Sequence, residues 1–495
     1  MQVSGSWFES RTARTVGWSG LALSVIGVLC VLFNPYLWFD EAGQFFISLG
    51  IDHWAPPFTR PGGWHSVMDR NNRYLFDPIG FTFLLRLWEN VSTNAIWLRT
   101  LPFLGFLGML VSGYCLLRKA RVERNLALLL IALLPSSPLL YQFAGELRPY
   151  SFEAWGALFA AWVWYDLQER KTASRSLLLG SGMALFLLIR YPFVLAAGVT
   201  GLLVLCRGLS NGWYRQSGWW RELAAYAVPQ IFMGVIVYIA CIRHQPISPQ
   251  APPYAMASTL KYNPAFLLHP WTLLNHGFLA LFGITLVLIK PNRDLFKRLA
   301  PWGAWSLGLL TCFTLFSLLG KLPSDPSSRW AIALNVMTMV CLLLVLAVLA
   351  EWLSFRLQVV FAFLVFLIAQ YRPALQTIRW ANEQPTGRIK GPVFVRELRE
   401  YSKVTTEPIV CGSGSNPEVR YLFEWGSLKP YQKECSYPGN FTLLTQENEK
   451  RHLNTMLPGK PEVWIDFPNR FFREGPFKGA LLPSQSTFYR LWRVQ

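Results

Sequence analysis

Long apolar segments alternate with short polar and basic segments over the first three quarters of the chain. Each apolar segment has about 15 to 24 residues, close to the length that an α-helix needs to cross the hydrocarbon core of a bilayer. The pattern predicts about eleven membrane helices. They run near residues 18–39, 98–117, 126–141, 149–165, 177–189, 191–205, 223–242, 271–289, 302–319 and 329–350, with a last one that follows Arg356 and ends near Gln370.

Lysine and arginine residues gather in alternate connections between these segments, which is the bias expected of cytoplasmic loops. Arg11 and Arg14 precede the first segment, and the second ends in a basic run at residues 118–124. The connection over residues 40–96 breaks the rule, because it belongs to the other face and yet contains four arginines. It is also too long for a simple connection, so we expect interfacial helices that lie on the membrane.

Composition agrees with a polytopic membrane protein: 52% of the residues are hydrophobic and 15% are charged. No segment has the pattern of a cleaved signal peptide, so we expect the first apolar run to stay as a membrane helix. The net charge of +18 is spread over short loops and the C-terminal region. That distribution argues against nucleic acid as a partner. The predicted fold is an all-α membrane domain at residues 1–371.

After Tyr371 the composition changes, and residues 372–495 have a size suitable for a small domain. Short strands are predicted at residues 408–411, 441–444 and 462–465, which favours an α/β fold. An odd number of membrane helices would place this domain outside the cytoplasm. Cys411 and Cys435 could form a disulfide there, and the sequence leaves their pairing open.

An acidic pair, Asp40-Glu41, stands where the first apolar segment ends. Carboxylates at such a position are costly unless they face water, a cation or a reaction. We interpret the pair as the floor of an active site. The two carboxylates could also bind a divalent cation, Mg²⁺ or Mn²⁺, and no other cofactor is indicated.

Three outward arginines each stand at the start of a helix that runs inward from the outer face: Arg148, Arg190 and Arg329. Each is followed by a proline within two residues or preceded by a serine that could cap the helix. A helix N-terminus favours anions, so the three arginines predict a phosphate site, with Lys321 as a fourth candidate. One such arginine alone would more simply be a side chain that snorkels to the lipid headgroups.

Two further carboxylates lie on either side of Arg148 in the sequence. Glu146 and Glu153 are seven residues apart and would share a helix face if the fourth helix starts early. Glu153 lies within an apolar segment, so we expect it to meet a partner or a cavity. Glu146 is equally suited to a structural ion pair near Arg148 and to catalysis.

The order of these motifs resembles the GT-C class of membrane glycosyltransferases, most of all protein O-mannosyltransferases and lipid A aminoarabinose transferases. The resemblance is carried by Asp40-Glu41, a long first outer loop, Asp77-Pro78-Ile79-Gly80, Arg148-Pro149-Tyr150 and Arg329-Trp330. It covers roughly residues 15–350. Many relatives have a histidine in a His-Pro-Pro-like segment of the first loop, and the segment at Asp77 lacks it.

The resemblance implies inverting transfer of a sugar from a polyprenyl-phosphate donor at the outer membrane face. It assigns Asp40 as the acceptor base or as a metal-organising group, with Glu41 in the second acidic place. Arg148 and Tyr150 match the Arg-x-Tyr turn of the family, and Arg329 matches its late Arg-Tyr with Trp330 in place of the tyrosine. Arg190 and Lys321 would add to the phosphate site, and Asp77, Glu146 and Glu153 would support it.

The expected partners are the polyprenyl-phosphate sugar, an acceptor that is a glycan, a lipid or a protein, and membrane lipids. The expected location is the bacterial inner membrane, with the active site and the C-terminal domain on the periplasmic face. A transporter or flippase of an anionic or lipid-linked glycan is the alternative, since it would also need outward arginines and intramembrane carboxylates. The lack of matched interrupted helices in two halves argues against that alternative.

Overall fold

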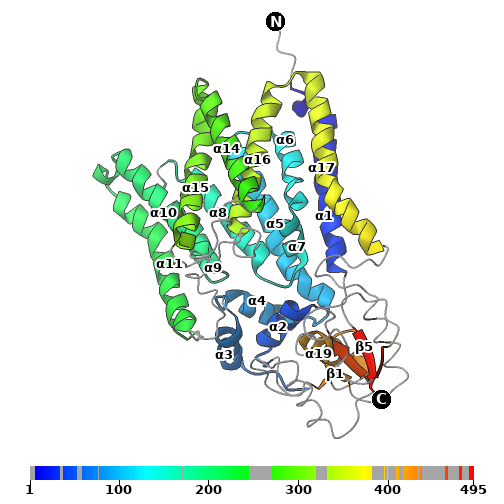
Figure 1. The fold of residues 1–495 in the computed structure, drawn as a ribbon. Helices are drawn as coiled ribbons and strands as arrows, with labels where there is room; N and C mark the ends of the chain where they lie inside the picture. The colour runs from blue at the N-terminus through cyan, green and yellow to red at the C-terminus, as the bar shows by residue number, and fades with distance from the viewer. Residues whose placement is uncertain are drawn as a thin grey trace.

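The structure is a computed structural model of the whole chain. It describes residues 6–33, 37–52, 58–75, 77–169, 171–244, 270–318, 332–381, 395, 399, 409–411, 416–431, 435–436, 463–466, 479–481 and 490–494. Figure 1 shows a helical bundle with two smaller parts side by side at one end of it: the short helices α2–α4 and a region with strands.

The bundle contains a helix for each predicted apolar segment. These are α1 (Arg11–Leu32), α5 (Ala95–Lys119), α6 (Arg124–Ile131) with α7 (Pro138–Gly145), α8 (Tyr150–Asp166), α9 (Ala173–Leu187), α10 (Phe193–Ser210), α11 (Trp219–Ala240), α14 (Pro270–Ile289), α15 (Arg293–Leu318), α16 (Ile332–Trp352) and α17 (Phe355–Ala381). Among the described residues, seven helices are long and apolar enough to cross a membrane, or eight if the bent pair α6 and α7 is one span.

Three predicted helix boundaries were wrong. The predicted first helix reached residue 39, but α1 ends at Leu32 and a separate helix starts at Phe39. The predicted helix at 126–141 is broken: α6 and α7 are bent by 82° around the 3₁₀ turn η2 (Leu134–Ser136). Pro135 and Pro138 explain the break, because proline has no N–H to donate within a helix. Finally, the last helix was predicted to end near Gln370, but α17 continues to Ala381.

The centre of the bundle is α8, most of whose side chains are buried. Glycines on α5 let that helix approach closely: a Cβ on Gly108 would lie 2.3 Å from the indole of Trp155, and one on Gly105 would lie 2.7 Å from Ser151 Oγ. On another side α15 packs through Trp302 and Trp305, which stack with ring centroids 5.2 Å apart. The close packing fixes the start of α8, where Arg148 lies.

The connection between α1 and α5 forms short helices, as predicted, and its described residues contain three: α2 (Phe39–Ser48), α3 (Trp64–Tyr74) and α4 (Gly80–Glu89). They lie together across one end of the bundle (Figure 1). A buried hydrogen-bond chain joins them, since Gln44 donates to Thr82 at 3.0 Å and Thr82 donates to Asn71 at 2.6 Å. Gly80 rests on the carbonyl of Leu188, where a Cβ would be only 2.5 Å from the oxygen.

The C-terminal part contributes five short strands and one helix, α19 (Asn416–Glu424). The strands β1 (Ile409–Cys411), β2 (Cys435–Ser436), β3 (Val463–Asp466), β4 (Gly479–Leu481) and β5 (Arg490–Val494) form one sheet in the order β2-β1-β3-β5-β4. β1 pairs in parallel with β2 and β3, and β5 runs antiparallel between β3 and β4. Two predicted strands correspond to β1 and β3, and the one at 441–444 lies outside the described residues.

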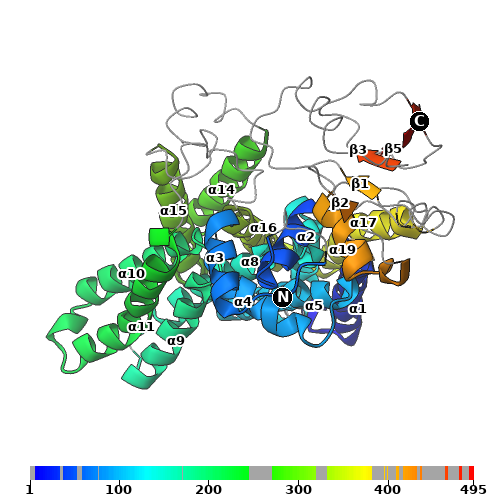
Figure 2. The same cartoon turned by 90° about the horizontal axis from the view of Figure 1, so that it is seen from below.

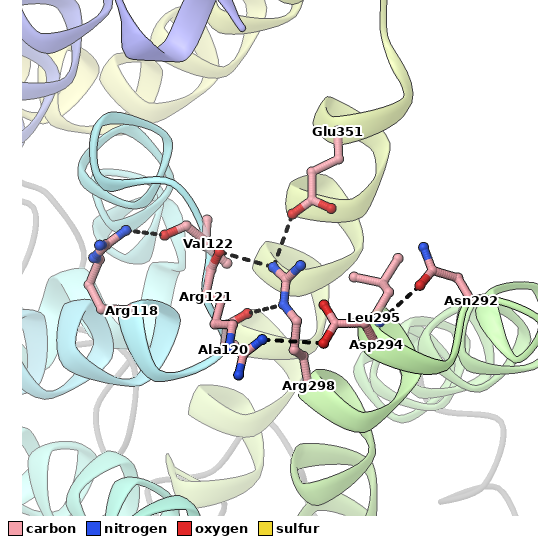
Figure 3. Close-up of polar contacts among 9 residues, drawn as sticks. All are labelled: Arg118, Ala120, Arg121, Val122, Asn292, Asp294, Leu295, Arg298 and Glu351. Atoms are coloured by element: carbon pink, nitrogen blue, oxygen red, sulfur yellow. Dashed lines mark hydrogen bonds and ion pairs between the residues drawn. The ribbon is translucent and has the colours of Figure 1, made fainter.

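At the opposite end of the bundle, Arg298 of α15 links three helices (Figure 3). Its guanidinium donates to the carbonyls of Ala120 and Arg121, both at 3.0 Å, and to the Glu351 carboxylate of α16 at 3.1 Å. Arg121 in turn pairs with Asp294 at 3.2 Å. These contacts lie at the basic turn after α5, which the charge bias predicts to be cytoplasmic.

Candidate active site

The acidic pair begins α2. Glu41 helps to start this helix, because its Oε2 accepts a hydrogen bond at 3.2 Å from the backbone N–H of Trp38, the residue before the first turn. Asp40 is half-buried in the same turn. The local sequence therefore holds Asp40 at a helix N-terminus that faces the bundle, which is where the site was predicted.

Glu41 is enclosed by donors. Arg99 of α5 binds it through two nitrogens, Nε to Oε1 at 2.9 Å and Nη2 to Oε2 at 2.6 Å, and the backbone N–H of Leu147 donates to Oε1 at 2.8 Å. Glu41 is 1% exposed and Arg99 is 3% exposed. Breaking such a buried pair is strongly destabilising, so the pair fixes α2 against α5, and the Leu147 N–H ties α2 to the turn between α7 and α8. Arg99 was not identified from the sequence.

Arg148 lies in that turn, directly before α8, and is 8% exposed. Its Nη2 lies 3.4 Å from the hydroxyl of Tyr150, and its guanidinium carbon lies 5.6 Å from the centre of the Tyr150 ring. Its Nε is buried without a hydrogen-bond partner in the described part of the chain. No carboxylate of the described residues forms an ion pair with it. Arg148 is therefore a buried cation with an N–H group left to bind an anion.

The electrostatic surroundings of Arg148 keep it charged. Burial alone lowers the pKa of a guanidinium, but Tyr150, Asp40 and Asp77 act more strongly in the opposite direction, so the pKa of Arg148 is raised. The interaction with Asp40 also shows that the first turn of α2 and the turn before α8 face one site. Two of the predicted site residues from distant parts of the chain are therefore brought together.

Arg190 lies before α10 and contacts the other side of the cluster. Its Nη1 binds Asp77 Oδ1 at 2.5 Å and its Nε binds Glu153 Oε2 at 2.8 Å. The guanidinium carbon lies 4.9 Å from the centre of the Tyr150 ring. Glu153 thus has the partner that its place in an apolar helix implied. Two carboxylates already offset the charge of Arg190, so the geometry favours a structural role for this arginine over the predicted phosphate contact.

The remaining predicted residues fall into two groups. Glu146 ends α7, where its Oε2 accepts a hydrogen bond from Gln142 at 3.0 Å. It does not share a helix with Glu153, because α8 starts only at Tyr150. Lys321 and Arg329 lie outside the described residues. Glu153 does face the backbone of Ala333 in the first turn of α16, the helix that Arg329 precedes in the sequence.

A divalent cation does not fit the acidic pair as it stands. Both oxygens of Glu41 already accept hydrogen bonds from Arg99, which leaves this carboxylate unsuited to a metal. In the part of the chain that the structure describes, no group of three or more histidine, cysteine, aspartate or glutamate side chains could hold a metal ion.

Solved structures with a similar fold were found. ArnT from Cupriavidus metallidurans in the apo state has 13% sequence identity and a TM-score of 0.55, over 97% of this chain and 98% of that one. The same protein bound to undecaprenyl phosphate gives 14% identity and a TM-score of 0.53, over 96% and 98% of the two chains. No family model and no curated protein matches the sequence. The chain thus has the ArnT fold over nearly its full length, as the resemblance to the GT-C class implied.

Proposed function

We propose that the chain is an integral membrane glycosyltransferase that moves a sugar from a polyprenyl-phosphate donor to an acceptor hydroxyl, with inversion at the anomeric carbon. The observation that carries the proposal is Arg148: a buried guanidinium without an ion-paired carboxylate among the described residues, next to Asp40. The ArnT fold, of which one solved structure is bound to undecaprenyl phosphate, supports the lipid part of the donor.

Arg148 would bind the donor phosphate. In a polyprenyl-phosphate sugar the phosphate is a diester with one negative charge, and when the bond to the sugar breaks it becomes a monoester that carries more charge. A fixed guanidinium in a site that excludes water stabilises this added charge more than the charge of the bound donor. The hydroxyl of Tyr150, 3.4 Å from Arg148, would orient the guanidinium.

Asp40 would act as the base. The acceptor oxygen attacks the anomeric carbon from the face opposite to the phosphate, the carbon–oxygen bond to the phosphate breaks, and Asp40 takes the proton of the attacking hydroxyl. One new glycosidic bond replaces the bond to the phosphate, so the configuration inverts in a single displacement. Glu41, held by Arg99, would keep the first turn of α2 in place.

The proposal extends to the membrane face, the C-terminal part and two further phosphate ligands. The site lies at the end of the bundle opposite to the basic turns, so we place it on the outer face of a bacterial inner membrane together with the C-terminal strands, which we assign to a small outer α/β domain. Lys321 and Arg329 remain proposed phosphate ligands, because they lie in or next to the chain that precedes α16.

The test is release of polyprenyl phosphate by the purified protein in lipid vesicles from a panel of polyprenyl-phosphate sugars. Asp40→Asn should lower release by about 10²- to 10⁴-fold, the usual contribution of a general base. Asp69→Asn is the matched control, since Asp69 lies on α3 in the same loop and its side chain is 44% exposed. Unchanged release in folded Asp40→Asn protein would refute the role of Asp40.

The same assay separates the proposal from the transporter alternative. A transferase consumes the donor and releases polyprenyl phosphate, whereas a flippase moves the intact lipid across the bilayer without cleaving it. Intact donors across the whole panel, together with lipid movement between leaflets, would favour the flippase.

A further inference from the structure

The helix α19, from the C-terminal part of the chain, packs directly on α2, the helix that begins with Asp40 and Glu41. Figure 2 views the molecule from the end that carries α2–α4, and α19 lies beside α2 there. The side chain of Tyr421 is fully buried, and its ring meets that of Phe45 edge to face with centroids 5.2 Å apart. Trp425 reaches the same Phe45 ring at 5.8 Å.

Tyr421 also connects α19 to the start of α5. Its hydroxyl donates a hydrogen bond of 2.8 Å to the carbonyl of Thr93, two residues before α5 begins. One turn further along α5 lies Arg99, the partner of Glu41. Tyr421 therefore touches both helices whose ion pair fixes the first turn of α2.

A second contact between α19 and α2 lies next to that of Tyr421 with Phe45. The guanidinium carbon of Arg420 lies 4.7 Å from the centre of the Phe46 ring, and Glu424 neutralises the arginine at 2.7 Å. Arg420 is fully buried, so this charge pair is enclosed between α19 and α2. A buried and hydrogen-bonded pair has one favourable geometry, which gives the contact a defined orientation.

The apolar core around α2 is incomplete without α19. Tyr421 belongs to the same buried cluster as Phe45, Leu98 and Leu147, which come from α2, α5 and the turn before α8. The cluster also contains Ala42, and Ala42 and Leu147 directly follow Glu41 and precede Arg148 in the sequence. Removing the ring of Tyr421 would open a cavity against α2 and let the helix shift.

We propose that Tyr421 is a positioning residue: through α19, the C-terminal part of the chain clamps α2 so that Asp40 is aligned with the donor. The inference rests on the proposed transferase function. It predicts that the C-terminal part serves the chemical step in addition to any contact with the acceptor. A displacement of a reacting group by about 1 Å can cost about 10²-fold in rate, so a clamp of this kind has a measurable effect.

The test combines two measurements on the full-length protein in lipid. Hydrogen–deuterium exchange of the α2 peptide, residues 39–48, should rise in Tyr421→Ala and stay unchanged in α8. The same variant should lower kcat for polyprenyl-phosphate release by about 10- to 100-fold, with little change in the binding of polyprenyl phosphate itself. Tyr421→Phe keeps the ring and should restore most of both properties.

Two further variants keep the test decisive. Phe45→Leu weakens the same contact from the side of α2 and should reproduce the effect if Tyr421→Ala folds poorly. Tyr214→Ala removes an equal side chain from an exposed 3₁₀ turn, η3 (Trp213–Arg215), and should change neither measurement. In an Asp40→Asn background, Tyr421→Ala should cause no further loss of rate, because both changes act on the same group.

Unchanged exchange of α2 in Tyr421→Ala would overturn the inference, and so would an equal additional loss of rate in the Asp40→Asn background. Failure of the proposed function is distinguishable from both outcomes. If the wild type releases no polyprenyl phosphate from any donor, the transferase assignment fails, while the exchange of α2 still decides whether α19 holds this helix.

Discussion

The turns before α8 and α10 present two buried arginines to the same tyrosine ring, yet the two arginines have opposite surroundings. Arg190 binds two carboxylates, Asp77 at 2.5 Å and Glu153 at 2.8 Å. Arg148 has the hydroxyl of Tyr150 at 3.4 Å and, among the described residues, no ion-paired carboxylate. The sequence context of the two is similar, and only the partner carboxylates differ. We therefore expect Arg148 to bind the phosphate of the proposed donor and Arg190 to stabilise the fold.

The largest expected effect comes from removing Arg190, the arginine that binds two carboxylates. Arg190→Ala would leave Asp77 and Glu153 buried without their counter-charge, and removing one partner of a buried pair costs about 3–5 kcal/mol of stability. We expect a large drop in the thermal unfolding temperature of the purified protein in lipid. Arg207→Ala, at an exposed position on α10, is the control and should unfold like the wild type. If the two variants unfold alike, the Arg190 cluster does not stabilise the fold.

The second prediction concerns the other arginine. Arg148→Ala leaves no carboxylate of the described residues without its ion-pair partner, so the unfolding temperature should change little. The rate of polyprenyl-phosphate release should fall by about 10²- to 10³-fold, the usual cost of removing one preorganised donor from a site of developing charge. Arg148→Lys keeps the charge without the planar fork and should recover part of the rate. A loss of stability as large as that of Arg190→Ala would contradict the distinction between the two sites.

Glu89 offers an intermediate case: a buried carboxylate on α4 with one partly exposed arginine partner, Arg86, at 2.9 Å. Burial raises the pKa of Glu89 to about 7 from an ordinary value of 4.5, although the hydrogen bonds from Ser48 and Arg86 act in the opposite direction. Between pH 4.5 and pH 7 the folded chain therefore keeps a proton on Glu89 that the unfolded chain has released. The contribution of Glu89 to stability is complete below pH 4.5 and is lost as the pH rises through 7.

Replacement of Glu89 by glutamine should remove this dependence. The free energies of unfolding of wild type and Glu89→Gln, measured from pH 4.5 to pH 8, should diverge by at most about 3 kcal/mol, with a flatter pH dependence for the variant. Parallel curves would show that Glu89 does not titrate in this range.

The smallest expected effect concerns Tyr150, whose ring contacts both arginines. Tyr150→Phe keeps the ring against both guanidiniums and removes only the hydroxyl that contacts Arg148. Loss of one such hydrogen bond costs about 0.5–1.5 kcal/mol, so we expect release to slow by about 2- to 10-fold without a change in unfolding temperature. A much larger loss of rate would indicate that the hydroxyl contacts the substrate itself.

The helices were predictable from sequence because each apolar run is long and uninterrupted, and the amphipathic helices of the first loop because its length and composition are unusual. Where prolines interrupt a run, as at Pro135 and Pro138, the prediction of one continuous helix was wrong. The apolar pattern does not reveal such a break, because the residues on both sides of the prolines are as apolar as those of a continuous membrane helix.

The site was predictable only in part. The sequence indicates which charged residues lie in or beside apolar segments, and Asp40, Arg148 and Arg190 were found in this way. It does not indicate which of them pair, because the partners of Arg190 are 113 and 37 residues away in the chain. The same limitation hid Arg99, whose partner Glu41 is 58 residues away. The roles of Asp40, Arg148, Lys321 and Arg329 stay predictions.

The link made by Arg298 has a mechanical consequence. It ties α15 and α16 to the end of α5 at one end of the bundle, through two carbonyls and one carboxylate (Figure 3). α16 has 21 residues and is therefore about 30 Å long, and its first turn faces Glu153 near the proposed site. A helix held at one end moves as a lever about that pivot. A tilt too small to break the contacts of Arg298 would still widen or narrow the distant end, where the proposed polyprenyl-phosphate donor would enter and leave.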